Sequence, residues 1–312
     1  MQPRDGFPSS IKDSLVAGQM TIFRLAHLSD VHLAPLPTPA FAELIGKRGL
    51  GLLNWLRKRR AIHRPEIVAA IAADLKSQTP DHIAVTGDLV NLSLSNEFEP
   101  ARAWLERLGP SGDVTVVPGN HDAYVRAAAT SAQDAWDAYM RGDGGESFPF
   151  VRRRGALALV GLTTSLPTLP LAATGRLGGS QLSKLGDTLD ALGREGLFRV
   201  VLIHHPPARA NRFRRLTDAA AFREVLRKHG AELVLHGHNH EASLVWLGGP
   251  RHLIPCICVP SASAAPGHHD DLAGYNLYEI DGEPGAWRCT AISRGINADG
   301  IVAEVNRIEL AD

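Results

Sequence analysis

The chain has 312 residues, of which 44% are hydrophobic, and its 33 Lys and Arg residues balance 33 Asp and Glu residues. This composition excludes a fibrous or disordered chain, and the net charge of zero gives no overall attraction to nucleic acid. We therefore expect a globular protein without a specific nucleic-acid partner. The cysteines Cys256, Cys258 and Cys289 lack zinc-finger spacing and indicate core thiols in a reducing compartment.

The first 20 residues are polar and contain Pro, Gly and Ser where a signal peptide would have a continuous apolar segment. We expect a flexible tail over 1–20 and a cytoplasmic protein. No run reaches the roughly 18 apolar residues typical of a membrane-spanning helix. Residues 21–312 show no internal repeat and no second boundary, which predicts a single domain.

From Thr21 onward, short runs rich in Ile, Val and Leu alternate with polar loops and segments of helical spacing, as in α/β proteins. The predicted strands are 21–29, 82–87, 114–119, 156–162, 198–204 and 231–237. The predicted helices are 64–78, 95–109 and 217–230. Thr217 is a suitable N-cap and Gly230 a suitable end for the last helix. Residues 241–312 contain short strands separated by turns and predict an added β layer.

Side chains of metal-binding type follow five of these predicted strands. In chain order they are Asp30 and His32, then Asp88, then Asn120 and His121, then His204, and finally His238 and His240. A structural explanation exists for each one alone, since Asp and Asn are common in turns and loops. Because the carboxyl ends of strands in an open α/β sheet converge on one crevice, their shared position favours one metal site.

Five short motifs occur in a fixed order, namely DVH (30–32), GD (87–88), GNHD (119–122), HHP (204–206) and GHNH (237–240). Together they resemble the motifs of the calcineurin-like metallophosphoesterases. The resemblance implies an α/β fold of four layers, α-β-β-α, in which two mixed β-sheets are flanked by helices. It also implies a phosphoester hydrolase, and the chain looks most like the bacterial phosphodiesterases of cyclic nucleotides and glycerophosphodiesters.

The resemblance further implies two metal ions that share Asp88 as a bridging ligand. One ion would be held by Asp30, His32, Asp88 and His240, and the other by Asp88, Asn120, His204 and His238. A shared carboxylate offsets the repulsion between two cations about 3.5–4 Å apart, and a hydroxide between them would attack phosphorus. Nitrogen and oxygen ligands without thiolate suit several metals. We favour Mn, Fe or Zn.

His121 and Asp122 are the catalytic residues that the resemblance implies. His121 would protonate or stabilise the leaving-group oxygen, and Asp122 would orient the His121 imidazole. We expect His205 to have a supporting or structural role. The remaining histidines of interest are His27 and His236, expected in the core, and His268 and His269, expected to be either solvated or close to the substrate.

Residues 46–64 form a basic amphipathic insertion that combines leucines and Trp55 with seven Lys and Arg residues. One interpretation is a helix whose leucines face the core and whose arginines are solvated. The other is a cap that binds a phosphate-bearing or lipid substrate, or a peripheral contact with an anionic membrane.

Three functions therefore remain open. A dinuclear phosphodiesterase with a small phosphoester substrate is favoured, and a hydrolase of a phospholipid or lipid-linked diphosphate at the membrane surface is the alternative. A non-catalytic scaffold of the same fold is disfavoured, because such scaffolds typically lose ligands and all the expected ones are present here.

Overall fold

The computed structural model describes residues 22–170, 172–208, 211–266, 271–297 and 299–311. The predicted tail over 1–20 and the loop histidines His268 and His269 lie outside these residues.

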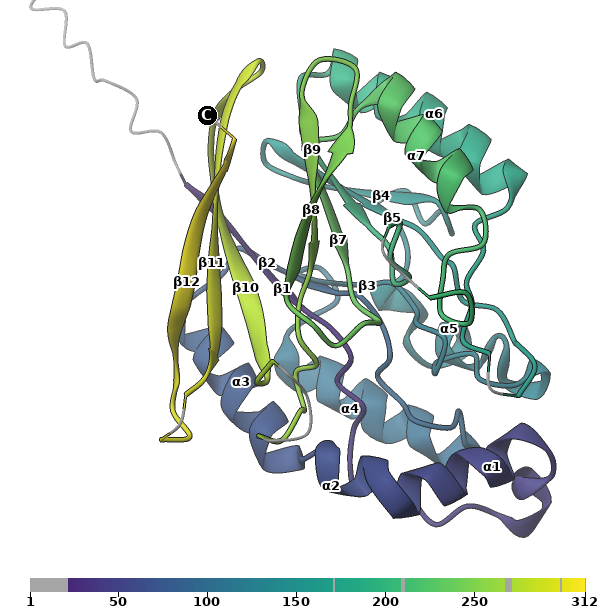
Figure 1. Cartoon of the computed structure of the whole chain (residues 1–312). Coiled ribbons are helices and arrows are strands. Elements are labelled where there is room, and N and C mark those ends of the chain that lie inside the picture. Colours follow the sequence, from purple (N-terminus) through teal and green to yellow (C-terminus); the bar gives the residue numbers. More distant parts are fainter. Residues whose placement is uncertain (1–21, 171, 209–210, 267–270, 298, 312) are drawn as a thin grey trace, which may run out of the picture.

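One six-stranded sheet has the strand order β12-β11-β10-β1-β2-β3 (Figure 1). Its strands are β1 (Phe23–Leu28), β2 (His82–Val85), β3 (Val114–Val116), β10 (Gly274–Glu283), β11 (Ala286–Ile296) and β12 (Val302–Ala311). Strands β1, β2 and β3 are parallel, whereas β10 pairs antiparallel with both β1 and β11. The sheet is therefore mixed, and the C-terminal strands extend it as the sequence predicts.

The second six-stranded sheet has the order β4-β5-β6-β7-β9-β8 and is also mixed. Its strands are β4 (Phe150–Arg154), β5 (Leu157–Gly161), β6 (Phe198–Leu202), β7 (Leu233–His236), β8 (Ser243–Gly248) and β9 (Leu253–Cys258). The face of each residue follows the two-residue period of a strand. Along β5, Leu157 and Leu159 join the core cluster that also contains the first sheet, and Ala158 and Val160 join the cluster beneath the helices.

Helices cover the outer faces of both sheets (Figure 1). The first sheet is covered by α3 (Pro65–Ser77) and α4 (Phe98–Leu108), and the second by α6 (Gly179–Arg194) and α7 (Ala219–His229). Shorter elements are η3 (Ser95–Glu97), η4 (Arg126–Ala128), α5 (Ser131–Trp136) and η5 (Asp137–Tyr139). The four-layer arrangement of two mixed sheets between helices confirms the predicted fold class.

The start of α7 differs from the prediction. The residue before its first turn is Asp218, whose carboxylate accepts hydrogen bonds from the backbone of Leu177 and Gly178, while Thr217 Oγ1 donates to Gly175 O at 2.9 Å. Thr217 is therefore not the N-cap, because its hydroxyl is used by a distant loop. Gly230 ends the helix as predicted, with φ of 76°.

The insertion between β1 and α3 is helical and lies at the lower end of the molecule in Figure 1. It consists of η1 (Phe41–Leu44), α1 (Lys47–Asn54), a π-helical turn η2 (Trp55–Arg59) and α2 (Arg60–Ile62). Among the described residues, no helix has both the length and the apolar character needed to cross a membrane.

The three cysteines are free thiols, and all three are buried.

Candidate metal centre

The loops that leave the strands converge on one site, as the sequence predicts. Residues after β1, β2, β3, β6 and β7 bring together the seven expected ligands, which are Asp30, His32, Asp88, Asn120, His204, His238 and His240. Six of them are buried, and His240 is half-buried.

One group of ligand atoms comprises Asp30, His32 and His240, whose atoms all lie within 4.8 Å of one another. His240 Nε2 is 3.1 Å from Asp30 Oδ1 and 3.4 Å from His32 Nε2. Asp30 Oδ1 is buried, and the His32 Nε2 atom lies 3.9 Å from it in addition to His240 Nε2. A bound cation would be coordinated by this buried carboxylate oxygen and by the two imidazole nitrogens that it faces.

A second group comprises Asp88, His204 and His238. His204 Nε2 is 3.4 Å from Asp88 Oδ2, 3.2 Å from His238 Nδ1 and 3.2 Å from Asn120 Oδ1. Asp88 Oδ2 is also 3.8 Å from His32 Nε2 in the first group. Asp88 thus faces histidines of both groups, the position that a carboxylate shared by two metal ions would occupy.

The charge states of the histidines fit a metal centre. Burial, Arg59 and neighbouring histidines hold the pKa of His32 well below its usual value, and burial likewise lowers the pKa of His238. Both rings are therefore neutral near pH 7, which is the form that binds metals. Burial also opposes a charge on His204, but the Asp88 and Asp30 carboxylates outweigh it and raise the pKa of His204 to about 9. Metal binding at His204 would release that proton.

Five of the expected ligands have a backbone conformation that is uncommon for residues other than glycine. Their φ angles are 53° for Asp30, 42° for His32, 57° for Asp88, 75° for His238 and 61° for His240. Such left-handed conformations are costly and concentrate at functional sites. Hydrogen bonds between the loops hold them, including Asp30 N to Gly87 O at 3.0 Å and His238 N to Asp30 Oδ2 at 2.9 Å.

Two glycines allow these loops to approach one another. A Cβ atom at Gly119 would overlap the Asp88 carboxylate, and one at Gly237 would overlap the Ser29 side chain and lie 2.5 Å from Asp30 Oδ2. Any larger residue in place of these two glycines of the GNHD and GHNH motifs would therefore clash beside a ligand.

His121 lies beside both ligand groups. Its ring is 4.9 Å from that of His32, and its Nδ1 is 2.5 Å from Asn91 O. Burial and the nearby Arg59 guanidinium lower the pKa of His121 to about 3, so the ring is neutral. With Nδ1 donating to Asn91 O, the other ring nitrogen, Nε2, is an acceptor, and it lies 3.1 Å from Arg59 Nη1.

Asp122 has different partners from those expected. Its carboxylate accepts hydrogen bonds from four backbone N–H groups, those of Asp88 at 2.9 Å, Leu89 at 2.9 Å, Val90 at 3.2 Å and Gly119 at 2.8 Å. The prediction that Asp122 orients the His121 imidazole is therefore wrong, since the Asn91 carbonyl makes that contact. Asp122 instead fixes the loop that carries Asp88. Burial and the Asp88 carboxylate raise the pKa of Asp122 to about 7.

The other described histidines have structural contacts. His205 Nδ1 is 2.7 Å from Thr164 Oγ1, in agreement with a supporting role. His27 and His236 are buried as expected, and His27 Nε2 is 2.9 Å from Thr86 Oγ1.

Two residues of the insertion that the sequence does not identify as site residues reach the centre. Arg59 Nη2 is 2.9 Å from His32 Nε2, and the ring of His63 lies 4.5 Å from the ring of His32. The insertion occupies the loop that follows β1, and this position at a strand's carboxyl end is the signal that could have placed it near the site. The sequence could not show which of the clustered basic side chains points inward.

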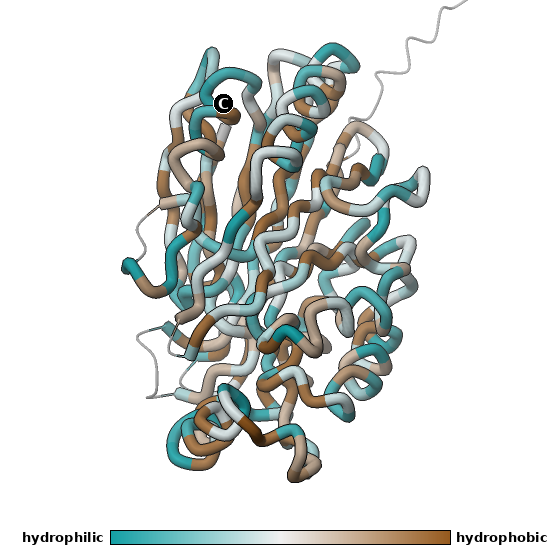
Figure 2. The backbone as a smooth tube through the Cα atoms, turned by 90° about the vertical axis from the view of Figure 1, so that its right-hand side faces the viewer, coloured by the Kyte–Doolittle hydropathy of each residue, from teal (hydrophilic) through white to brown (hydrophobic). Residues whose placement is uncertain are grey.

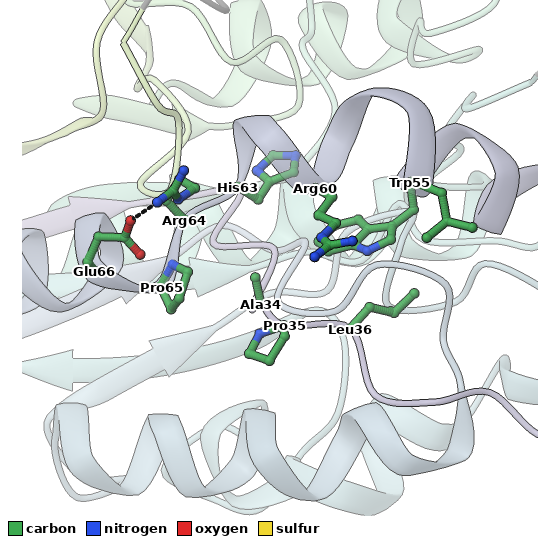
Figure 3. Close-up of a pocket in the computed structure, with 10 residues that line it drawn as sticks. Ala34, Pro35, Leu36, Trp55, Arg60, His63, Arg64, Pro65 and Glu66 are labelled. Carbon is green, nitrogen blue, oxygen red and sulfur yellow. Dashed lines mark ion pairs between the residues drawn. The ribbon is translucent and has the colours of Figure 1, made fainter.

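A cavity of about 610 Å³ lies next to the centre, on the side of the insertion (Figure 3). His63 lines both the cavity and the centre. The other walls include apolar Pro35 and Leu56 and basic Arg60 and Arg64. Arg64 is paired with Glu66 at 2.5 Å, which leaves Arg60 as a cationic group facing the cavity without a carboxylate partner among the described residues.

Comparison with known proteins gives the same family as the motifs. Residues 23–242 match the calcineurin-like phosphoesterase family model. A probable cyclic nucleotide phosphodiesterase of Synechococcus sp. is 26% identical over 278 residues, which cover 87% of this chain and 92% of that protein.

Two solved structures have the same fold. A dimetal phosphatase from Danio rerio has a TM-score of 0.63 at 14% identity, covering 93% of this chain and 98% of its own. A purple acid phosphatase from yellow lupin seeds has a TM-score of 0.59 at 14% identity, covering 94% of this chain and 54% of its own. With the family model matching most of the chain and the ligand groups assembled at its strand ends, the chain belongs to the calcineurin-like phosphoesterases.

Proposed function

We propose that this phosphoesterase is a phosphodiesterase that works with two metal ions, Mn, Fe or Zn. The observation that carries the proposal is the position of Asp88, which belongs to the buried group with His204 and His238 and also faces His32 of the other group. Two ions held there would lower the pKa of a water molecule toward neutrality and neutralise charge on the phosphoryl oxygens. The similarity to a probable cyclic nucleotide phosphodiesterase supports a diester substrate, with cyclic nucleotides as one candidate.

The protein's own groups prepare the site for this reaction. The backbone N–H of His121 donates to Asp88 Oδ1 at 2.7 Å, which fixes the shared carboxylate. Asp122 holds the backbone of Asp88 from the other side. The ring of His121 lies 4.9 Å from that of His32, and its protonated form would donate a proton to the leaving oxygen.

The test is a substrate panel on protein that has been stripped of metal and reloaded with Mn²⁺, Fe²⁺ or Zn²⁺. We expect hydrolysis of bis(p-nitrophenyl) phosphate and of at least one cyclic nucleotide or glycerophosphodiester, well above hydrolysis of p-nitrophenyl phosphate. Preference for the monoester would contradict the diesterase proposal. Full metal loading without any hydrolysis would favour a scaffold.

A specific observation favours the membrane-surface hydrolase as a second candidate. Three leucines of the insertion do not face the core, since Leu50, Leu53 and Leu56 are 55%, 44% and 58% exposed. Phe41 and Ile45 just before them are 90% and 80% exposed. Figure 2 shows brown and teal segments side by side at this lower end of the molecule. An apolar patch of this kind marks an interaction surface.

Charge complementarity makes an anionic membrane the proposed partner of this patch. Arg57, Lys58 and Arg60 are exposed on the same helical segment, and each basic residue near an anionic membrane contributes on the order of 1 kcal/mol. The substrate would then be a phospholipid or a lipid-linked diphosphate.

Vesicle sedimentation separates the two candidates. Replacement of Leu50, Leu53 and Leu56 by Ser should release the protein from vesicles containing phosphatidylglycerol, while hydrolysis of a small water-soluble diester continues. A control variant replaces the exposed Arg102 and Arg107 of α4 by Ser. Equal vesicle binding by the wild type and the leucine variant would exclude the membrane-surface candidate and leave only the phosphodiesterase of small substrates.

A further inference from the structure

Arg59 connects the helical insertion to the metal centre. Its Nη2 is 2.9 Å from His32 Nε2, its Nη1 is 3.1 Å from His121 Nε2, and its Nε is 3.3 Å from His63 Nε2. All three contacts are donations from a guanidinium to imidazole nitrogens, because an arginine side chain has no acceptor. A cation is thus held against both an expected ligand and the expected leaving-group residue.

The backbone of the insertion directs this side chain inward. Arg59 is the last residue of the π-helical turn Trp55–Arg59, and turns of this type occur frequently at functional sites. Its neighbours Arg57, Lys58 and Arg60 are exposed, whereas Arg59 is half-buried. The turn therefore directs the Arg59 side chain, but not those of the neighbouring basic residues, toward the centre.

His63 and Trp55 fix the guanidinium in this position. His63 accepts from Arg59 Nε, and its other nitrogen, Nδ1, lies 2.7 Å from Ser263 Oγ. The rings of Trp55 and His63 stack, with centroids 6.1 Å apart and planes 7° apart. Ser263 Oγ in turn lies 3.4 Å from the carbonyl oxygen of Asp30. Arg59 is thus connected to the ligand loop through side chains that are themselves buried.

The chemistry of the contacts points to an anionic ligand. His32 Nε2 faces Asp30, Asp88 and His240, so its lone pair is the one that a metal ion would use. When that lone pair is taken by a metal, Arg59 Nη2 loses its acceptor and becomes a free donor next to the metal. A guanidinium is always charged in proteins, and its fork of donors matches phosphate oxygens.

We propose that Arg59 is a catalytic residue that binds the phosphoryl oxygens of the substrate, delivered to the metal centre by the helical insertion. This inference rests on the phosphodiesterase function proposed above. It assigns the insertion a direct part in the reaction, in addition to any contact that its outer face makes. It also explains why the π turn and the stacked pair of Trp55 and His63 lie beside the first group of ligands.

The experiment measures binding of inorganic phosphate by calorimetry to metal-loaded wild type, Arg59→Ala, Arg59→Lys and a control, Arg107→Ala. Arg107 is exposed on α4, and its replacement makes the same change in net charge. We expect Arg59→Ala to keep both metals by elemental analysis and to bind phosphate roughly 10- to 100-fold more weakly, the usual size of a charged hydrogen bond. Arg59→Lys should recover only part of this loss, and the control should match the wild type.

Two results would overturn the inference. One is unchanged phosphate affinity in Arg59→Ala with both metals bound. The other is loss of metal from that variant, which would make Arg59 a support for His32 and not a phosphate ligand. Diester hydrolysis is assayed on the same wild-type sample. Arg59-dependent phosphate binding without diester hydrolysis would uphold the inference and contradict the proposed function, so the two are distinguishable.

Discussion

The backbone N–H of His121 donates a 2.7 Å hydrogen bond to Asp88 Oδ1. The residue expected to act on the leaving group therefore holds the carboxylate expected to bridge the metals. The other oxygen of Asp88, Oδ2, is 3.4 Å from His204 Nε2 and 3.8 Å from His32 Nε2. This hydrogen bond links the loop after β2, which carries the expected bridging ligand, to the loop after β3, which carries the expected proton donor. Metal content and kinetics must therefore both be measured in each variant.

The bridging position of Asp88 predicts a difference between two carboxylate variants. Asp88→Ala should abolish activity and reduce the content of both metals, whereas Asp30→Ala should mainly weaken one. The reason is that Asp88 lies between both ligand groups and Asp30 belongs to one. Elemental analysis of the purified variants is the measurement. Loss of the same single metal from both variants would contradict a bridge.

The His121 imidazole predicts a dependence on the leaving group. His121→Ala should keep both metals and slow hydrolysis by roughly 10²–10⁴-fold on alkyl esters, the usual contribution of a positioned acid or base. The loss should be much smaller on p-nitrophenyl esters, because p-nitrophenolate departs without a proton. The kinetics of both ester classes are compared at full metal loading. Loss of metal would make His121 a ligand, and equal losses on both classes would remove it from the leaving-group role.

The contacts of Asp122 predict an effect on stability and metal binding. Asp122→Asn removes one acceptor oxygen from four backbone donors, which should cost about 1–3 kcal/mol of unfolding free energy. Metal affinity should fall with it, because the loop of Asp88 is held less firmly. Urea unfolding and metal titration measure both effects. The ratio of rates on alkyl and aryl esters should stay that of the wild type, and a ratio like that of His121→Ala would restore the role first expected for Asp122.

An ion pair far from the centre predicts a pH-dependent part of the stability. Asp74 on α3 accepts from Arg294 Nε at 2.7 Å, Arg294 Nη2 at 2.8 Å and Tyr275 Oη at 2.7 Å. Burial opposes the charge, but these contacts outweigh it and lower the pKa of Asp74 below its usual 3.8. Their contribution is therefore fully present above pH 3.8 and is lost as the pH falls through the lowered pKa.

Asp74→Asn should therefore reduce the unfolding free energy by about 1–2 kcal/mol at pH 7, and the difference from the wild type should shrink below pH 4. Chemical denaturation at several pH values is the measurement. Glu106→Gln, which breaks the exposed pair of Arg102 and Glu106, serves as the control and should change stability little. A difference that does not vary with pH would show that the charge of Asp74 is not the cause.

The ligand positions could be predicted from the sequence because they depend on local information. Each follows a strand whose apolar run is visible, and the carboxyl ends of such strands share one crevice. The strands of the C-terminal part could be predicted because their apolar runs are also visible in the sequence. The two mixed sheets and their flanking helices came from the resemblance carried by the motifs.

Other features could not be predicted, because they depend on contacts between distant segments. Asp122 is adjacent to His121 in sequence, yet its carboxylate accepts a hydrogen bond from the backbone N–H of Asp88, 34 residues earlier. Thr217 is of a residue type that often caps helices, but its hydroxyl donates a hydrogen bond to Gly175 O. Arg59 could not be distinguished from the basic residues around it, because a π turn determines which of them points inward.

Anomalous X-ray diffraction of crystals grown with Mn²⁺ is the most direct test of a two-metal centre bridged by Asp88. We predict two anomalous peaks about 3.5–4 Å apart, the usual spacing of such pairs. The Asp88 carboxylate should contact both, with Asp30, His32 and His240 around one peak and Asn120, His204 and His238 around the other. A single peak, or two peaks that do not share Asp88, would contradict the account.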